Sequence, residues 1–262
     1  MNTMHPATTP EKLIEVCKEL KEKGAAGCLI SGGCLPNGSV PLNKFTEAIK
    51  QIKRELGLTV FVHTGIVDFE TARALKKARV DAALIDIIGS NETIREIYNM
   101  NVTVKDYEES LEALKKADLV FVPHVIVGLD YGKLKGEMHA LEMVSKHDPS
   151  ALVIIAFMPI HGTEMRNVQP PEPLEIAKVL VTARLMLPAT PMVLGCMRPR
   201  GTHRTETDIL ATKAGVNAIA FPAEEAIEYA ETHNYEVAFS PACCAQIYSD
   251  LKGISPSNVN QE

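Results

Sequence analysis

Tryptophan is absent from this chain, and no apolar run approaches the about 20 residues that a membrane-spanning helix needs. Aromatic residues make up only 5% of the 262 residues, and the formal net charge is −6. Because there is no excess of basic residues, we expect no nucleic-acid partner. Because there is no long apolar run, we expect no membrane partner either. The first ten residues have neither a basic nor an apolar stretch of the kind found in export signals, so we expect a cytoplasmic protein.

Cysteine is also scarce, with six residues in the whole chain. Disulfide frameworks are typical of short secreted chains, so free thiols, metal ligands or iron–sulfur ligands are the expected uses here. With 46% hydrophobic and 23% charged residues, the composition is that of a globular protein with a large core. We therefore expect one domain over residues 1–262.

Apolar runs and helical patterns alternate along the chain, and this alternation predicts the fold class. Apolar runs that lack a two-residue alternation and are separated by helices indicate a parallel sheet covered on its outer face. The sequence thus predicts an α/β fold, a partial or complete βα barrel of the TIM type. The expected strands are centred near Leu29, Val60, Leu84, Val120, Ile154, Val193 and Ile219. The expected helices are Pro10–Lys23, Leu42–Leu56, Phe69–Ala78, Glu92–Tyr98, Tyr107–Lys116, Gly136–His147, Pro173–Leu187, Thr207–Ala214 and Ala223–Thr232.

The number of strands leaves two interpretations open. The chain opens with a helix that Thr9 is expected to cap, whereas a barrel normally opens with a strand. Either Gly27–Ser31 is the second strand of a barrel whose first strand is missing, or Tyr235–Phe239 supplies an eighth strand.

Polar and glycine residues follow successive apolar runs, always on the same side. In a parallel barrel these positions lie around one rim, where barrel enzymes carry their chemistry. Two glycines in Ser31-Gly32-Gly33 would let the backbone approach an amino or carboxylate group, or would simply form a tight turn. Asp86 could accept two hydrogen bonds from a ribose diol, cap the next helix or pair with an arginine.

Three histidines, His63, His124 and His161, also follow strands. Together with Asp86 they could hold a divalent metal, although a single histidine at the edge of a core is often only structural. Metal hydrolases built on barrels usually also carry an H-x-H pair on the first strand, and this chain has only the isolated His5.

Two loops could receive a flat ring. The strand that contains Ile126 enters a glycine-rich loop at Gly128, where apolar side chains could lie against a ring. The next loop contains Pro159, Gly162 and Thr163, and its backbone could read the edge of a purine. Each loop could equally be a mobile connection without a ligand.

The hexapeptide from Cys196 to Gly201 includes Arg198, which could bind a ligand carboxylate or another substrate anion. Cys243 and Cys244 are adjacent, and adjacent cysteines do not easily form a disulfide with each other. Ligation, redox chemistry and chance all remain open for this pair. The segment from Tyr235 to Leu251 is long enough either to fold back toward Cys196 or to pack on the outside. If it folds back, Cys34 could join the group.

As a set, these motifs resemble the radical SAM superfamily. Ser31-Gly32-Gly33 resembles the glycine motif that binds the amino group of S-adenosylmethionine in that family. The sequence His124-x-Ile126-x-Gly128, followed by Glu137, is similar to its G-x-I-x-G adenine segment, with His124 in place of the first glycine. The strings PHVIVGL, PIHGT and GCMRPRG are similar to biotin and lipoyl synthases, particularly the archaeal two-subunit lipoyl synthases.

The resemblance implies S-adenosylmethionine as the cofactor and a sulfur-insertion or related C–H-activating reaction. It implies a small-molecule or lipoyl-domain-type substrate, and a homologous subunit as a candidate partner. It assigns no catalytic side chain. The implied cofactor-binding residues are Ser31, Gly32, Gly33, His63, Asp86, His124, Ile126, Gly128, Pro159, Gly162, Thr163 and Arg198. The candidate ligands of an auxiliary iron–sulfur cluster are Cys28, Cys34, Cys196, Cys243 and Cys244.

One departure from the family is plain in the sequence: it contains no C-x-x-x-C-x-x-C motif. In the family this loop binds the [4Fe–4S] cluster and lies just before the helix that here begins at Pro10. We interpret the loop and the first strand as lost upstream of Met1, which favours the first of the two strand counts. We therefore expect this chain by itself not to generate the 5′-deoxyadenosyl radical. A metal-dependent barrel hydrolase and a non-catalytic partner subunit remain as alternatives.

Overall fold

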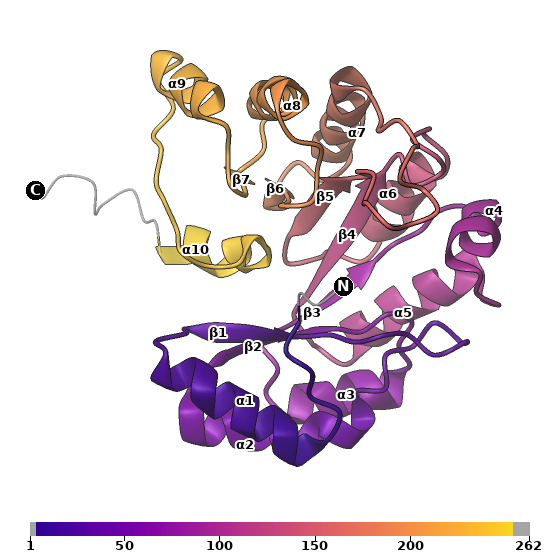
Figure 1. The fold of residues 1–262 in the computed structure, drawn as a ribbon, viewed down its shortest axis with the longest axis vertical. Coiled ribbons are helices and arrows are strands. Elements are labelled where there is room, and N and C mark those ends of the chain that lie inside the picture. The colour runs from indigo at the N-terminus through magenta and orange to yellow at the C-terminus, as the bar shows by residue number, and fades with distance from the viewer. Residues whose placement is uncertain (1–3, 254–262) are drawn as a thin grey trace, which may run out of the picture. The chain divides into compact units, whose positions relative to one another are not determined.

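The structure is a computed structural model, and it describes residues 4–253 (Figure 1). The strands are β1 (Gly27–Ile30), β2 (Thr59–His63), β3 (Ala82–Asp86), β4 (Phe121–Val127), β5 (Leu152–Ala156), β6 (Met192–Leu194) and β7 (Ala218–Ile219). The helices are α1 (Pro10–Glu22), α2 (Thr46–Leu56), α3 (Phe69–Lys77), α4 (Asn91–Thr93), α5 (Val104–Lys116), α6 (Glu137–Ser145), α7 (Pro173–Met186), α8 (Thr202–Lys213), α9 (Glu224–Thr232) and α10 (Ile247–Gly253). Shorter helical turns are η1 (Asn43–Phe45), η2 (Ile94–Tyr98) and η3 (Cys244–Gln246).

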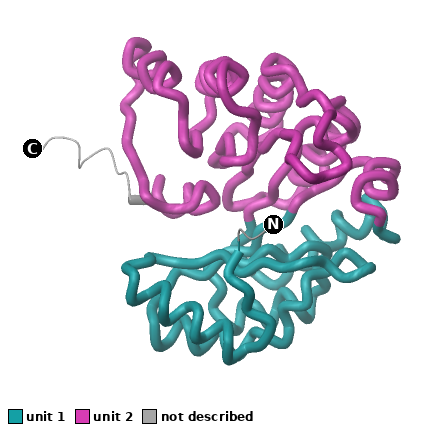
Figure 2. The backbone as a smooth tube through the Cα atoms, viewed as in Figure 1, with its two compact units in different colours: residues 1–85, 100–121 teal, residues 86–99, 122–262 magenta. Residues whose placement is uncertain are grey.

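The backbone divides into two compact units, shown in Figure 2. Unit 1 comprises residues 1–85 and 100–121, and unit 2 comprises residues 86–99 and 122–262. The sequence led us to expect one domain over residues 1–262.

Unit 1 contains β1, β2 and nearly all of β3, which pair in parallel in this order. Helices α1, α2 and α3 lie on one face of these strands (Figure 1). Helix α1 packs against α2, and α3 packs against α5. The predicted start of α1 is confirmed, because the Thr9 side chain accepts a hydrogen bond from the Lys12 N–H and Pro10 occupies the first turn. The apolar stripe of α1 buries Leu13 and Cys17, so the local signals and the packing agree.

Unit 2 contains nearly all of β4 together with β5, β6 and β7, again parallel and in sequence order. Every residue of β5 is buried, as expected for a parallel strand between two neighbours. Each of α6, α7 and α8 packs against the next helix along the chain. After α9 the chain runs through an extended segment and returns to α10 (Figure 1), with η3 in contact with β5. The seven predicted strands are therefore all present, and those that pair within each unit are parallel.

Two expectations from the sequence differ from the structure. Residues 235–240 contain no regular structure, and both Tyr235 and Phe239 are exposed, so the predicted eighth strand is not present there. Because neither aromatic side chain is buried, no hydrophobic stabilisation holds this run against the edge of the sheet. Helix α8 begins at Thr202, five residues before the predicted start, after Gly201 in a positive-φ conformation. Its first turn holds Thr202, His203 and Thr205, which have weak helix propensity and hid the start. Within the described residues, no helix combines the length and apolar character needed to cross a membrane.

Candidate functional site

The ends of β3 and β4 bring two of the expected residues together in unit 2. The Ile87 N–H, directly after Asp86, donates to the His124 carbonyl oxygen at 2.8 Å. The side chains of Asp86 and His124 are both half-buried, and both have contacts within the protein. The His124 Nδ1 lies 3.1 Å from the Val122 carbonyl oxygen, so part of this imidazole is used locally. Ile126 follows on the same strand with 8% of its surface exposed.

The loop after β4 is built around a buried carboxylate. The Gly128 N–H donates to Glu137 Oε1 at 2.8 Å, and the Lys135 N–H donates to Glu137 Oε2 at 2.6 Å. Burial raises the pKa of Glu137 above its ordinary value, against the lowering effect of these backbone donors. Gly128 has φ +75°, and a Cβ there would lie 2.6 Å from Pro171 Cγ. Glycine at this position is therefore required by packing, and its N–H is already occupied.

The loop after β5, in contrast, is exposed around Gly162. The Phe157 N–H donates to the Val127 carbonyl oxygen at 2.8 Å, which holds the start of this loop against β4. Beyond it, the Thr163 hydroxyl donates to the Ile160 carbonyl oxygen at 2.8 Å and closes a turn. His161 and Gly162 are exposed, and a Cβ on Gly162 would meet nothing within 4 Å. The backbone of this turn is consequently open to a ligand.

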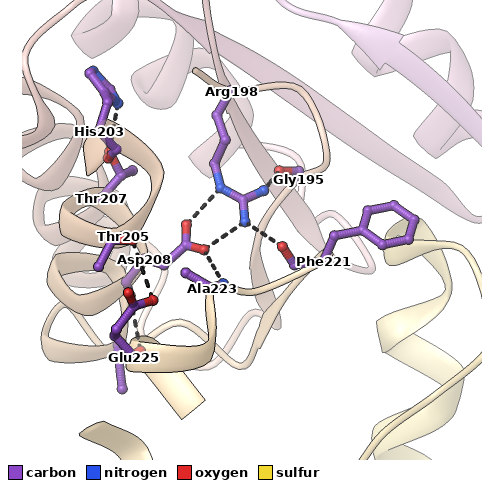
Figure 3. A network of polar contacts seen from close by, with 10 residues as sticks. Gly195, Arg198, His203, Thr205, Thr207, Asp208, Phe221, Ala223 and Glu225 are labelled. Carbon is purple, nitrogen blue, oxygen red and sulfur yellow. Dashed lines mark hydrogen bonds and ion pairs between the residues drawn. The ribbon is translucent and has the colours of Figure 1, made fainter. Parts of the chain in front are cut away.

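Arg198 belongs to unit 2, and its side chain is 0% exposed. Figure 3 shows its polar contacts. Its guanidinium forms a two-pronged ion pair with Asp208 of α8, with Nε–Oδ1 at 2.6 Å and Nη2–Oδ2 at 2.8 Å. It also donates to the carbonyl oxygens of Gly195 and Phe221, at 2.7 and 3.2 Å. Asp208 in turn accepts from the Ala223 N–H at 2.9 Å.

The arrangement around Arg198 differs from the expectation that it binds a ligand anion. A buried guanidinium needs a partner, and this one has its carboxylate within the protein. Arg198 joins the end of β6 to α8 and to the segment after β7 through these contacts. The sequence analysis did not identify Asp208, and the only sequence signal for it was a carboxylate on the helix that follows an arginine-containing loop.

Two of the candidate cysteines lie near β5 in unit 2. Cys196 follows the neighbouring strand β6 and is exposed, and Cys244 is half-buried and opens η3, which contacts β5. The neighbouring Cys244 thiol, backbone N–H groups and the Arg198 charge lower the pKa of Cys196, and burial opposes this effect. The Cys196 and Cys243 thiols and burial raise the pKa of Cys244. Of the two placements left open for the C-terminal segment, the contact of η3 with β5 agrees with the one in which the segment folds back.

Two further candidate cysteines have sulfur contacts within unit 1. Cys28 Sγ lies 3.8 Å from Cys17 Sγ, and Cys34 Sγ lies 3.6 Å from Met100 Sδ. Across the part of the chain that the structure describes, no group of three or more His, Cys, Asp or Glu side chains is arranged to hold a metal ion. An iron–sulfur cluster needs about four ligands around one centre, so the observed arrangement does not fit the expected auxiliary cluster. The set of His63, His124, His161 and Asp86 forms no such group either.

The segment Ser31-Gly32-Gly33 follows β1 in unit 1 without regular structure. Gly32 and Gly33 are exposed, and a Cβ on Gly33 would meet nothing within 4 Å. The backbone here is open, as a segment that binds a small ligand through its N–H and C=O groups requires. His63 ends the neighbouring strand β2, where its side chain is half-buried and has contacts within the protein.

Comparison with known families matches the chain in two parts. The radical SAM superfamily matches residues 3–134, and the biotin and thiamin synthesis associated domain matches residues 154–247. The biotin synthase of Geotalea uraniireducens is 28% identical over 68% of this chain and 54% of its own length. The biotin synthase of Hyphomonas neptunium is 26% identical over 80% of this chain and 64% of its own length. The chain thus spans less than two thirds of these relatives.

Solved structures match the fold. Methylornithine synthase (PylB) covers 97% of this chain with a TM-score of 0.63 at 17% identity, and 78% of that protein is covered. HydG, a maturase of the [FeFe]-hydrogenase, covers 83% of this chain with a TM-score of 0.60 at 16% identity, and 50% of it is covered. These likenesses confirm the predicted fold class, a parallel α/β fold of the partial TIM-barrel type. The chain belongs to the radical SAM superfamily, and its sequence is biotin synthase-like.

Proposed function

We propose that this chain binds S-adenosylmethionine and that unit 2 recognises the adenosyl end. The observation that carries the proposal is the sequence of adjacent strand ends in unit 2. Asp86 follows β3, Ile126 lies on β4, and the open turn at Gly162 follows β5, with hydrogen bonds joining each end to the next. A carboxylate suits a ribose diol, an apolar side chain suits a ring face, and open backbone groups suit a purine edge.

For the methionine end, the proposal rests on the sequence motif Ser31-Gly32-Gly33, whose exposed backbone in unit 1 is compatible with it. His63, His124, Pro159 and Thr163 are proposed as further contacts. Arg198 is proposed only as a positioning residue, because its guanidinium is buried against Asp208.

The biotin synthase relatives support sulfur insertion, or a related C–H activation, as the reaction class. We propose a small-molecule or lipoyl-domain-type substrate, a homologous subunit as a candidate partner, and the cytoplasm as the location. In the family, a [4Fe–4S] cluster supplies the electron that cleaves S-adenosylmethionine. These 262 residues contain no C-x-x-x-C-x-x-C motif, so we propose that the chain alone binds the cofactor without cleaving it. Neither the metal-hydrolase interpretation nor that of a non-catalytic partner subunit gains support from the site or the relatives.

Calorimetry with S-adenosylmethionine and S-adenosylhomocysteine tests the binding proposal. We expect weak binding by the chain and a clear loss of affinity in Asp86→Asn. Asp148→Asn is the matched control, because Asp148 precedes β5 and so lies at the other end of the strands. Absence of binding at millimolar ligand, or equal losses in both variants, would contradict the proposed site.

A separate assay tests the proposed lack of cleavage. The purified chain is incubated with S-adenosylmethionine and dithionite under anaerobic conditions, and 5′-deoxyadenosine is measured. We expect none, and its release by the chain alone would overturn this part of the proposal while leaving the binding site intact.

A further inference from the structure

Phe221, directly after the end of β7, has a backbone conformation that is unusual for a bulky residue. Its φ is +50°, in the left-handed region that favours glycine and asparagine. The next residue is Pro222, and a proline favours an extended backbone in the residue that precedes it. The backbone of Phe221 is therefore strained, and the surrounding structure has to hold it in place.

Most other residues with this backbone conformation have a simple explanation. Among the described residues, seven non-glycine residues have a positive φ, and five of them lie within three residues after the end of a helix. Left-handed backbone is ordinary at helix ends. The five are Arg79, Asn99, Asp118, Asp148 and Asn234. A sixth, Tyr131, lies in a tight turn that the Gly132 N–H closes by donating to the Gly128 carbonyl oxygen at 2.8 Å. Phe221 follows a strand instead.

The buried ion pair of Arg198 and Asp208 fixes the backbone at Phe221. Arg198 Nη2 donates to the Phe221 carbonyl oxygen at 3.2 Å, and the Ala223 N–H donates to Asp208 Oδ2 at 2.9 Å. Both charged side chains are 0% exposed, so these contacts come from the interior of unit 2. The conformation of Phe221 is thus imposed by the packed part of the protein.

The side chain of Phe221 does not share in this packing. It is 77% exposed, and Figure 3 shows its ring pointing away from Arg198 and Asp208. A ring that stays in water adds little to folding, so burial of the ring does not compensate for the strain. Strained residues that the surrounding structure holds in place are concentrated at ligand sites. Phe239 is also 77% exposed but has no positive φ, so exposure alone does not distinguish Phe221.

Phe221 lies on the edge of unit 2 that carries the proposed adenosyl site. It follows β7, and the open turn at Gly162 follows β5, so both come after the carboxyl ends of parallel strands. Only β6 separates these two strands, and two strand spacings amount to about 10 Å. A small molecule bound beside the adenosyl group can therefore reach Phe221.

We propose that Phe221 contacts the hydrocarbon portion of a small-molecule substrate bound beside the adenosyl site of unit 2. This inference rests on the proposed function, because a C–H-activating reaction acts on a carbon that carries hydrogen. Contact with the phenyl ring removes hydrocarbon surface from water. The fixed backbone holds the ring in place, so less conformational freedom is lost on binding. Phe221 is a binding residue and takes no part in bond breaking.

The test uses hexanamide as the probe, with the purified chain saturated with S-adenosylhomocysteine. The chain is deuterated except at its phenylalanine rings, and nuclear Overhauser effects from the rings to the methylene hydrogens of hexanamide are measured. We expect such effects in the native chain and their loss in Phe221→Asn, since asparagine tolerates the left-handed backbone. The affinity for hexanamide should fall about fourfold, the effect of withdrawing about one methylene group from contact.

Phe239→Asn is the matched control, because Phe239 is as exposed as Phe221 and belongs to the same unit. It should keep both the Overhauser effects and the affinity. Effects that persist in Phe221→Asn, or that fall equally in the two variants, would overturn the inference while leaving the adenosyl site intact. A native chain that binds no S-adenosylhomocysteine would instead contradict the proposed function, and this inference with it.

Stability separates a binding role from a structural role of the ring. Phe221→Asn should raise the midpoint of urea denaturation, because the backbone strain is relieved and no buried contact is lost. Phe239→Asn should leave the midpoint nearly unchanged. A lower midpoint in Phe221→Asn would show that the ring stabilises the fold, and it would overturn the proposal that the strain serves binding.

Discussion

The loops after β4 and β5 look alike in the sequence but differ in the structure. Each follows a buried strand and contains a glycine with positive φ, Gly128 in the first and Gly162 in the second. The N–H of Gly128 is bonded to the buried Glu137, and its Cα faces Pro171, whereas Gly162 is surrounded by open space. The loop after β4 is therefore packed and hydrogen-bonded within the protein, whereas the loop after β5 presents its backbone to solvent. A glycine motif at a strand end does not by itself say which of these roles it has.

Arg198, after the end of β6, resembles Gly128 in this comparison, because it too is bonded within the protein. Arg198→Met should leave Asp208 as a buried carboxylate without its ion-pair partner, which costs about 3–5 kcal/mol of unfolding free energy. Urea denaturation measures this loss, with the exposed Arg200→Met as the control, which should be nearly neutral. Equal losses in the two variants would show that the pair with Asp208 is not the source.

Gly128→Ala should be the next most damaging change. The positive φ costs a non-glycine residue about 1–2 kcal/mol, and overpacking against Pro171 adds about 1–3 kcal/mol. We expect a lower free energy of unfolding by urea and a less rigid loop. A loss no larger than that of Gly162→Ala would remove the difference between the two loops.

Glu137→Gln should cost about 1–2 kcal/mol, because an amide cannot accept from both backbone N–H groups. It should also change the pH dependence. Burial raises the pKa of Glu137 in the folded state above its value in the unfolded chain. The stability linked to this shift is present below the unfolded pKa and is lost as pH rises through the folded pKa.

The pH effect is measured as the free energy of unfolding of the native chain and of Glu137→Gln across this range. The native chain should lose stability relative to the variant as pH rises. Parallel pH profiles for the two proteins would contradict the raised pKa.

Gly162→Ala should have the smallest effect on stability, near the lower end of the about 1–2 kcal/mol that a positive φ costs, because nothing else opposes a side chain there. If the turn binds the adenine edge, affinity for S-adenosylhomocysteine should nevertheless fall. Calorimetry and urea denaturation of the same variant separate the two effects. A stability loss as large as that of Gly128→Ala, with unchanged affinity, would reverse the comparison between the loops.

The sequence predicted an element correctly where the residues that begin the element are adjacent to it. Thr9 and Pro10 determine the start of α1 through a cap and a fixed φ, and both are adjacent to the helix they begin. The start of α8 was predicted too late because its first turn holds residues of weak helix propensity. The ion pair of Arg198 with Asp208, which attaches this helix to the end of β6, joins residues that a local pattern does not connect. The run from Tyr235 to Phe239 has the composition of a strand, but no neighbouring strand buries it.

The sequence by itself determined the strands and the polar groups that follow them, because each depends on residues close together in the chain. Only the tertiary structure decided which of those groups face a ligand and which face the protein. Arg198 meets Asp208, and Gly128 meets Glu137. The physical reason is that a polar group at a strand end must satisfy its charge or hydrogen bonds, and the partner that does so is selected by packing.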